Sequence, residues 1–565
     1  MTEFAATLNC LILENITNQN PTVTFDKSLI KLPPNIQLAD PNFNVRDGID
    51  ILIGAKLFWN LLIGSPIQIQ KDQPYFQNTK LGFVVGGELL VANTRNRNKA
   101  CNVVSYSSDQ DLHLKVQSFW EQEEIYHDKS VLSAEQLQAE QHFTENTFRN
   151  PQGKFVVKLP FKNDASLGNS YNIAIKRFLN LERRFQREPQ LLTSYKGFIT
   201  EYLLLKHMEP VPRNELGNSN KYYLPHHAVF KQTINGPKIR VVFDGSAKTP
   251  NNTCLNENLL NGPTIQQDLF SILCRFRIHQ HVLSADITKM YRMILVNPSD
   301  RDFQRILWRD SITEPIQEFR LNTVTYGTTC APFLAVRCLY QLAVDSKNNY
   351  PIASDIIERD FYMDDLLTGS NTVEEALIIK KQISNILAQA GFDLCKWNSN
   401  SKELLSSQDQ HESEINFNKN GDCKILGFIW NSSDDQLKYQ FRVNPVQSQD
   451  LVTKRSILST IANIFDPLGL INPIIVKFKI LLQIIWSHKL EWDQPVPEDV
   501  RAMWEKLIIG LPELNQFRIP RKVISSVDQG SMFEIHGFAD ASIKAYGACV
   551  YIRTINSTQE ISVKL

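Results

Sequence analysis

The chain has 565 residues, of which 42% are hydrophobic, and its 60 basic and 60 acidic side chains give a formal net charge of zero. This length predicts several domains with real hydrophobic cores, and the composition argues against long disorder. The charge balance argues against a protein that coats DNA; we expect any nucleic-acid partner to be held by local basic surface.

Cysteine usage and hydropathy point to the inside of a cell. The nine cysteines form no Cys-x-x-Cys pair, which indicates reduced thiols and gives no zinc finger. No basic leader precedes an apolar stretch at the N-terminus, and the apolar run 471–486 contains Lys477 and Lys479. We therefore expect a soluble, non-secreted protein with no membrane partner.

The first 150 residues carry no recognisable chemistry. Residues 1–64 end in the apolar run Asp50-Ile51-Leu52-Ile53, then Gly54 and an apolar turn, and no Asp-Thr-Gly or Asp-Ser-Gly precedes residue 64. An aspartic protease needs that aspartate, which shares a proton with its mate, so peptide cleavage is not expected. Residues 65–150 contain Thr79–Gly87, the acidic amphipathic stretch Phe119–Ile125 and a helix predicted from a cap at Ser133, and we expect scaffold there.

From Gly153 the pattern changes to an alternating strand over 154–160 and a helix from about Ser170. The apolar stripe of this helix includes Phe178 and Leu181. Its basic residues are Lys176, Arg177, Arg183, Arg184 and Arg187. They favour template-backbone binding and solvated surface equally, because Glu182 and Glu188 dilute the charge. His226 and His227 follow in a predicted strand, where neighbours point in opposite directions, so they make poor joint metal ligands.

Lys238 and Arg240 alternate along the next predicted strand, after the turn Asn235-Gly236-Pro237, so both cations project from one face. Cationic side chains on a strand suit a triphosphate, and arginine offers a rigid fork for phosphate oxygens. Exposed charges that only maintain solubility are the alternative.

Three aspartates form the most informative pattern. One strand-like segment, His281–Ile287, carries Asp286 near its end. A β-leaning run formed by Ile356-Ile357 and then Phe361-Tyr362 reaches Asp364-Asp365, and Leu366-Leu367 leads away, as in a hairpin with the acids at its tip.

Adjacent carboxylates repel unless a cation neutralises them, and Mg²⁺ accepts one or two carboxylates while leaving the rest of its shell to water and phosphate. Three acids around two ions can orient a triphosphate, activate a hydroxyl and stabilise a leaving oxygen. A solvated turn is the alternative for an isolated Asp-Asp pair.

Tyr362-Met363-Asp364-Asp365, with Asp286 and Tyr291 upstream, closely resembles motifs C and A of reverse transcriptases, and the surrounding phrases resemble the polyprotein of a BEL/Pao-type long-terminal-repeat retrotransposon. The resemblance covers nearly the whole chain and is most specific over residues 220–430. It implies an α+β right-hand polymerase. Its predicted parts are a retropepsin-like protease remnant at 1–64, a connector at 65–150, fingers and palm at 151–432, a mainly helical thumb or connection at 433–525, and the start of a ribonuclease H-like domain at 526–565. An ordinary small β-segment is the alternative for residues 1–64.

The resemblance implies RNA-directed DNA synthesis on a primed RNA or DNA template, with dNTPs as substrates. Asp286, Asp364 and Asp365 would be catalytic and, with Ile287, would form the site for two Mg²⁺ ions, for which Mn²⁺ is the alternative. Localisation in a cytoplasmic retroelement particle or in the nucleus would follow. The rival reading is a catalytically inactive nucleic-acid-binding remnant of a degraded retroelement.

The resemblance also assigns roles around the incoming nucleotide. Arg240, and less closely Lys238, match phosphate-binding positions. Tyr291 matches the aromatic residue under the sugar that excludes a 2′-hydroxyl, although a core tyrosine is the alternative. Gly327 belongs to a motif B-like stretch, Thr325–Phe333, in which Tyr326 replaces the glutamine of retroviral enzymes. A glycine permits close approach and Pro332 suits the first turn of a helix.

Further positions are assigned to primer, template and product. Lys396, in a motif D-like stretch, would donate a proton to pyrophosphate. The expected primer and template residues are Tyr362, Met363, Gly427 and Trp430, although buried core explains Trp430 and Phe428 equally well.

At the C-terminus, Ile535–Ser542 and Tyr546–Tyr551 resemble the first hairpin of a ribonuclease H fold. Asp540 would be the first of its metal-binding acids. The elements that carry the other acids are not expected within the chain, so RNA cleavage is not predicted, and an exposed β-edge is expected.

Overall fold

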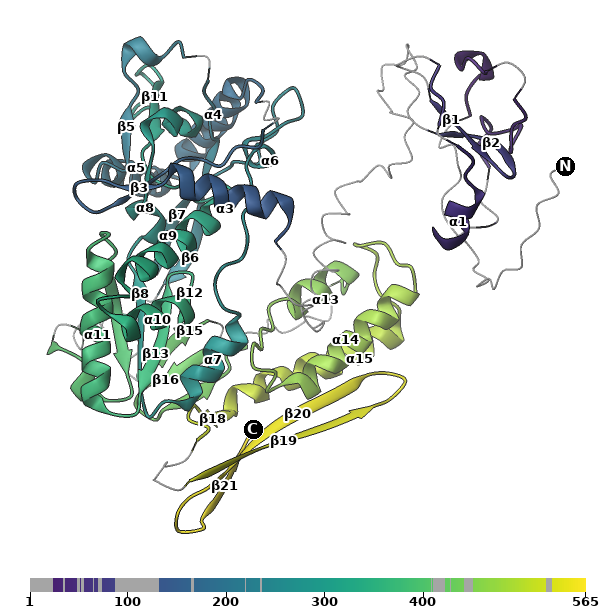
Figure 1. Ribbon diagram of the computed structural model, residues 1–565. Helices are drawn as coiled ribbons and strands as arrows, with labels where there is room; N and C mark the ends of the chain where they lie inside the picture. Colours follow the sequence, from purple (N-terminus) through teal and green to yellow (C-terminus); the bar gives the residue numbers. More distant parts are fainter. Residues whose placement is uncertain are drawn as a thin grey trace. The chain divides into compact units, whose positions relative to one another are not determined.

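The computed structural model describes residues 24–33, 36–47, 51, 55–64, 66–69, 74–86, 132–163, 167–218, 220–233, 236–407, 409, 422–426, 428–441, 451–524 and 531–565. The chain divides into two compact units, Met1–Lys129 and Ser130–Leu565 (Figure 1). The predicted features Phe119–Ile125 and Gly427 lie outside the described residues, as does most of the run from Asp50 to Gly54.

The described part of the first unit is a β-hairpin with a short helix. Strands β1 (Tyr75–Thr79) and β2 (Gly82–Gly86) pair antiparallel, and α1 (Ala55–Leu61) precedes them. The fully buried Phe76 and the buried Ile30 form a small core with partly buried apolar neighbours. Neither the hairpin nor the helix carries catalytic chemistry, so the protease-remnant assignment stays a prediction.

The second unit is a mixed α/β structure built around a four-stranded antiparallel sheet. Its order is β12 (Phe361–Tyr362), β13 (Asp365–Ser370), β8 (His281–Ile287) and β14 (Leu394–Ser399). Most side chains of β8 and β13 are buried, as expected for strands in the middle of a covered sheet. Helix α11 (Val373–Ala388) packs on both of these strands (Figure 1).

The predicted strand character of Ile356-Ile357 is wrong. Both residues lie in helix α10 (Pro351–Arg359), and the strand begins only at Phe361. Pro351 sits in the first turn, and Ala353, Ile356 and Ile357 are buried at i, i+3 and i+4 spacing, which places them on one helical face. A short apolar run without its flanking context does not distinguish this helix from a strand.

Helices α4 (Tyr171–Arg187) and α5 (Pro189–Leu204) cover a second sheet region. Helix α4 contacts β10 and β6, and α5 contacts β7 and β5. The strands concerned are β5 (Met208–Pro210), β6 (His226–Thr233), β7 (Gly236–Phe243), β10 (Arg305–Trp308) and β11 (Gln317–Leu321). The predicted apolar stripe of α4 is confirmed, since Phe178, Leu181 and Phe185 are buried.

Polar side chains on β6 and α4 find partners within this region. His226 is buried, where its Nε2 donates to the Leu307 carbonyl oxygen at 3.0 Å and its Nδ1 contacts the Tyr195 hydroxyl, so both ring nitrogens have partners within the protein. On α4, Arg184 pairs with Glu188 and Arg177 with Asp244, so these two exposed cations have local acidic partners.

The main hydrophobic core runs from Ala139 to Leu404 and includes residues of most of the remaining elements before residue 405, though none of α7 or β3. Helix α3 (Ala134–Asn146) begins at the predicted cap, Ser133, which forms a capping box with Gln136. The other elements are β3 (Phe148–Arg149), β4 (Phe155–Val157), α6 (Leu255–Asn258), α7 (Leu269–Ile278), α8 (Met290–Met293), β9 (Leu295–Val296) and α9 (Ala331–Ser346).

The C-terminal part is helical between two sheets. One sheet contains β15 (Asp422–Ile425), β16 (Phe428–Asn431), β17 (Gln436–Lys438) and β18 (Arg518–Pro520). The helices are α13 (Lys454–Ile461), α14 (Asn472–Ser487) and α15 (Glu498–Gly510), which confirms the helical prediction for this region. None of the helices in the described part of the chain has the length and apolar character that crossing a bilayer requires.

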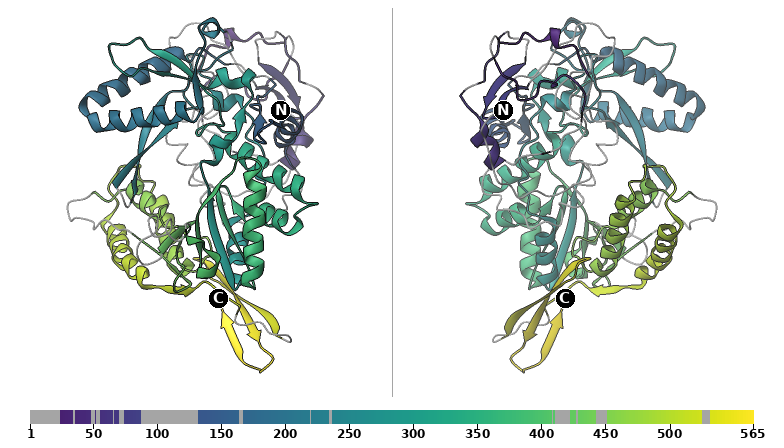
Figure 2. Two further views of the ribbon diagram at one scale, coloured as in Figure 1. Left: turned by 90° about the vertical axis from the view of Figure 1, so that its left-hand side faces the viewer. Right: turned by 90° about the vertical axis from the view of Figure 1, so that its right-hand side faces the viewer.

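The last sheet is a ribbon of β19 (Met532–Ala541), β20 (Tyr546–Ile555) and β21 (Ile561–Lys564), drawn in yellow in Figure 2. This confirms the predicted hairpin. Many of its apolar side chains are exposed, including Ile535 at 76% and Tyr546 at 79%.

Candidate active site

Strand register brings the predicted acids together. Asp365 lies directly opposite Asp286 in the antiparallel pair of β13 and β8. The backbone N–H of Ile287 donates to the carbonyl oxygen of Asp364 at 2.8 Å, which ties the turn before β13 to the end of β8. Three acids from distant segments therefore meet at one end of the central sheet.

The turn that carries Asp364 is held in an unusual backbone conformation. Met363 has a φ of 57°, a left-handed value that a methionine adopts only when its surroundings fix it. Its backbone N–H donates to the side-chain Oε1 of Gln266 at 3.0 Å. Gln266 is thus a positioning residue that the sequence did not reveal, because this hydrogen bond spans 97 residues of chain.

The acids repel one another. Burial raises the pKa of the Asp364 carboxyl above its usual value, and the charge of Asp286 raises it further. Lys396 forms an ion pair with Asp286. Burial alone would lower the pKa of Lys396, but the hydrogen bond and charge of Asp286 outweigh burial and raise it. The ammonium group therefore acts as the cation of the site.

The carboxylates have the hard oxygen donors that Mg²⁺ prefers. The pKa of Asp364 is raised mainly by burial and further by the charge of Asp286, and a divalent cation would favour its ionised form. In this arrangement, however, no group of three or more His, Cys, Asp or Glu side chains among the described residues is placed to hold a metal ion. The donor chemistry fits a divalent cation, and in this arrangement Lys396 holds Asp286 in an ion pair.

Arg240, Tyr326 and Tyr291 form a layer beside the acids. The guanidinium carbon of Arg240 lies 5.9 Å from the centre of the Tyr326 ring, and that ring lies 4.5 Å from the ring of Tyr291. Burial raises the pKa of both tyrosines, with Asp364 contributing, so both hydroxyls stay neutral. The residue that replaces glutamine is thus the middle of this layer, a role that the sequence did not predict.

Of the two cationic residues predicted to bind the nucleotide phosphates, Arg240 and Lys238, only Arg240 has a described side chain. Arg240 is exposed on β7. Lys238 is also in β7, but its side chain lies outside the described set. Tyr291 packs partly against the main core, so the core alternative explains part of its environment.

The backbone packing around position 327 requires a glycine. Its φ is 97°, and a Cβ added there would lie 1.9 Å from the carbonyl oxygen of Phe243 in β7. Asn256 fixes the same loop, because its side chain donates to the Gly327 carbonyl oxygen and accepts from the Thr329 N–H, each at 2.9 Å. The predicted helix follows as α9, with Pro332 in its first turn.

The predicted primer and template residues separate into two kinds. Tyr362 and Met363 are half-buried at the turn. Trp430 has no exposed surface; it packs 5.3 Å from the Phe276 ring and donates to Asp435 at 3.1 Å. Its side chain is therefore not available to a primer in this structure, and the core alternative is confirmed for Trp430.

Asp540 lies elsewhere, on β19. It is exposed, and the residue opposite it on β20 is Gly547. One of its oxygens accepts the N–H of Ala541 at 2.8 Å. The strand pair therefore places no second carboxylate opposite Asp540.

Residues 453–565 match a family model described as a Pao retrotransposon-like RNaseH-like domain. This segment contains α13 to α15 and the strands from β18 to β21. No curated protein matches the chain. The match supports a Pao-type retrotransposon protein, and it does not include the residues of the acid cluster.

Proposed function

We propose that this protein is an RNA-directed DNA polymerase of a Pao-type retrotransposon, which extends a primer by two-metal nucleotidyl transfer. In this proposal the sheet of β8 and β13 is the palm, the β6–β7 hairpin belongs to the fingers, and the helices from α13 to α15 form a thumb or connection. The expected substrates are dNTPs and a primed RNA or DNA template.

The register of Asp286 opposite Asp365, with Asp364 joined to Ile287 at the adjoining turn, carries the proposal. Burial and the charge of Asp286 oppose the ionisation of Asp364, and a carboxyl whose pKa is shifted by burial and by a specific charged neighbour is a candidate functional group. The family match at the C-terminus supports the same class of element.

Each residue of the site has a defined task in this proposal. Asp286, Asp364 and Asp365 would hold the divalent ions, which supply charge neutralisation for the triphosphate and activation of the primer hydroxyl. Arg240, exposed at the edge of the layer, would bind phosphate oxygens through its planar fork. Tyr291 would lie under the sugar, and Tyr326 would hold the ring of Tyr291 in position.

Lys396 links substrate binding to proton transfer. The pair with Asp286 raises its pKa and keeps it protonated; once it has left Asp286, burial would lower that pKa, so the ammonium group would become a better proton donor to the pyrophosphate. The same ion pair favours the second candidate function, a nucleic-acid-binding protein without polymerase activity. In that case Lys396 would neutralise Asp286 permanently, which agrees with the finding that the described residues offer no group of three metal donors.

Primer extension distinguishes the two functions. The test uses poly(rA) annealed to oligo(dT), with dTTP and Mg²⁺, and compares the chain with Asp364→Asn; fluorescence anisotropy of the labelled duplex measures binding in parallel. Extension by the unmodified chain and its loss in the variant, with binding retained, would support the polymerase. Binding by both without extension would favour the second function, and equal extension would refute the assignment of Asp364.

A further inference from the structure

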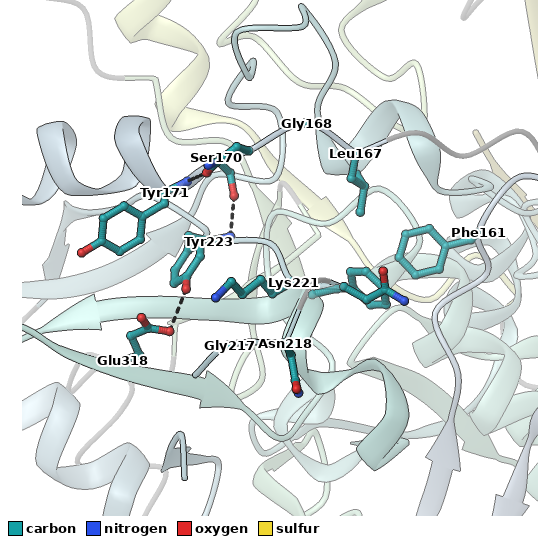
Figure 3. Close-up of a pocket in the computed structure, with 13 residues that line it drawn as sticks. Phe161, Leu167, Gly168, Ser170, Tyr171, Gly217, Asn218, Lys221, Tyr223 and Glu318 are labelled. Carbon is teal, nitrogen blue, oxygen red and sulfur yellow. Dashed lines mark hydrogen bonds between the residues drawn. The ribbon is translucent and has the colours of Figure 1, made fainter. Parts of the chain in front are cut away.

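A cavity of about 720 Å³ lies within the second unit, away from the acid cluster. Its walls come from the start of α4, the segment before β6 and β11 (Figure 3), and from Phe161 and Phe303. This volume falls within the range of small-molecule sites in proteins.

The walls of the cavity are fixed by buried hydrogen bonds. The hydroxyl of Ser170 accepts the backbone N–H of Tyr223 at 2.7 Å, and the hydroxyl of Tyr223 donates to Glu318 at 2.7 Å, as Figure 3 shows. The fully buried Arg305 also donates to Glu318, at 2.9 Å. Glu318 is thus paired within the protein, with an arginine that it shares with Asp302.

Aromatic rings line two sides of the cavity. Tyr171 and Tyr223 form an edge-to-face pair with ring centres 5.1 Å apart, and Phe161 and Phe303 form another at 4.7 Å. In the view of Figure 3, Lys221 lies between Tyr223 and Phe161. Flat apolar rings on two sides suit a flat ring in a ligand.

The cavity presents one positive charge to a ligand. The ammonium group of Lys221 lies 5.8 Å from the centre of the Tyr223 ring and donates to the carbonyl oxygen of Leu216. Exposed side-chain amides of Asn169 and Asn220 supply donors and acceptors at the rim. An aromatic surface, amide groups and a single cation together match a nucleobase with its phosphate.

We propose that this cavity binds one unpaired nucleotide of a single strand, with the base against Tyr171 and the phosphate at Lys221. The choice of a strand over a free nucleotide rests on the proposed function. Lys221 and Tyr223 directly precede β6, whose hairpin partner β7 carries Arg240. A strand held at the cavity is therefore joined through this hairpin to the candidate active site.

Binding of a fluorescein-labelled oligo(rU) strand, measured by anisotropy with the full chain, tests the proposal. Removal of an aromatic face that stacks on a base lowers affinity about tenfold, so Tyr171→Ala should bind about tenfold more weakly. Tyr171→Phe, which keeps the ring, should bind like the unmodified chain. Lys221→Gln should weaken binding and reduce its salt dependence, because one phosphate contact is lost.

Matched controls and a second readout keep the test independent of folding. Tyr75→Ala and Lys347→Gln remove an exposed tyrosine and an exposed lysine elsewhere and should leave binding unchanged. A strand containing 4-thiouridine should crosslink, on irradiation, to a peptide that includes Tyr171 or Tyr223. Uridine monophosphate should compete only weakly with the strand. Strong competition would show that the ligand is a free nucleotide and would contradict binding of a strand.

The outcomes separate this proposal from the polymerase. If the chain extends primers but Tyr171→Ala and Lys221→Gln bind and crosslink like the controls, the cavity proposal is wrong. If the chain fails to extend primers while both variants lose binding and crosslinking, the cavity proposal is supported and the polymerase proposal is refuted.

Discussion

Two sheets of the second unit carry an aspartate that was predicted to bind metal, and they place it in very different surroundings. In the central sheet, Asp286 faces Asp365 across paired strands and forms an ion pair with Lys396. In the C-terminal ribbon, Asp540 is exposed and faces Gly547. Both aspartates lie in stretches that resemble family motifs, but only Asp286 lies opposite another acid.

The difference teaches that strand register and burial, rather than a local motif, make a set of acids into a site. The acids at the end of the central sheet are partly buried, and the charge of Asp286 raises the pKa of Asp364. The ribbon leaves apolar side chains such as Ile535 and Tyr546 exposed, and charges there are screened by water. The following predictions test this contrast.

The largest expected difference concerns two arginine ion pairs. Arg521 is fully buried, donates to Asp435 at 2.6 and 2.7 Å, and also binds the carbonyl oxygens of Phe276 and His279. Arg521→Met leaves these acceptors unpaired and should lower the free energy of unfolding by roughly 3–5 kcal/mol. Arg553→Met breaks an exposed pair with Glu534 on the ribbon and should leave urea unfolding unchanged. Equal effects would contradict the contrast.

Two glycines provide the next comparison. Gly327→Ala forces a Cβ to within 1.9 Å of the Phe243 carbonyl oxygen at a positive φ, and should destabilise the chain by about 3 kcal/mol. Gly537→Ala on β19 meets open space and should be neutral or slightly stabilising, since alanine loses less entropy in a strand. Thermal unfolding of the two variants checks this, and a tolerated Gly327→Ala would disprove the tight contact.

A buried histidine predicts a pH dependence of the covered region. Burial lowers the pKa of His226 to about 4, so the unfolded chain, with an ordinary pKa of 6.5, takes up the proton first. Stability is therefore complete above about pH 6.5 and is lost as the pH falls toward 4, by roughly 3 kcal/mol for this group. Unfolding free energies measured against pH should show a smaller slope in His226→Gln than in the unmodified chain, and an equal slope would contradict the role of this histidine.

The smallest predicted effect concerns Tyr326. Tyr326→Ala removes the ring that packs on Tyr291 and should lower discrimination between dTTP and UTP by about tenfold or less. The ratio of kcat/KM for the two nucleotides measures this effect. Tyr326→Phe keeps the ring and should keep the ratio, and Tyr546→Ala, on the exposed ribbon, should not change it. An unchanged ratio in Tyr326→Ala would remove Tyr326 from the specificity layer.

Sequence patterns predicted those parts that depend on neighbouring residues. The Ser133 cap, the stripe of α4 and the turn at Asp364 all follow from local spacing. The helix at Ile356 was missed because a few apolar residues fit either period.

Contacts between distant segments could not be predicted from the sequence. Gln266 and Asn256 hold two loops of the candidate site through hydrogen bonds that span 97 and 71 residues. Tyr326 was noted only as a replacement for glutamine, and its layer with Arg240 depends on how β7 meets that loop. The burial of Trp430 likewise depends on α7, which is distant in the chain.

Single-nucleotide primer extension with Mg²⁺, comparing Asp286→Asn with Asp540→Asn, tests the central claim most directly. The account predicts that Asp286→Asn lowers the rate roughly a thousandfold, because a metal-binding carboxylate is lost, while Asp540→Asn extends the primer like the unmodified chain. Full activity in Asp286→Asn, or an equal loss in both variants, would contradict it.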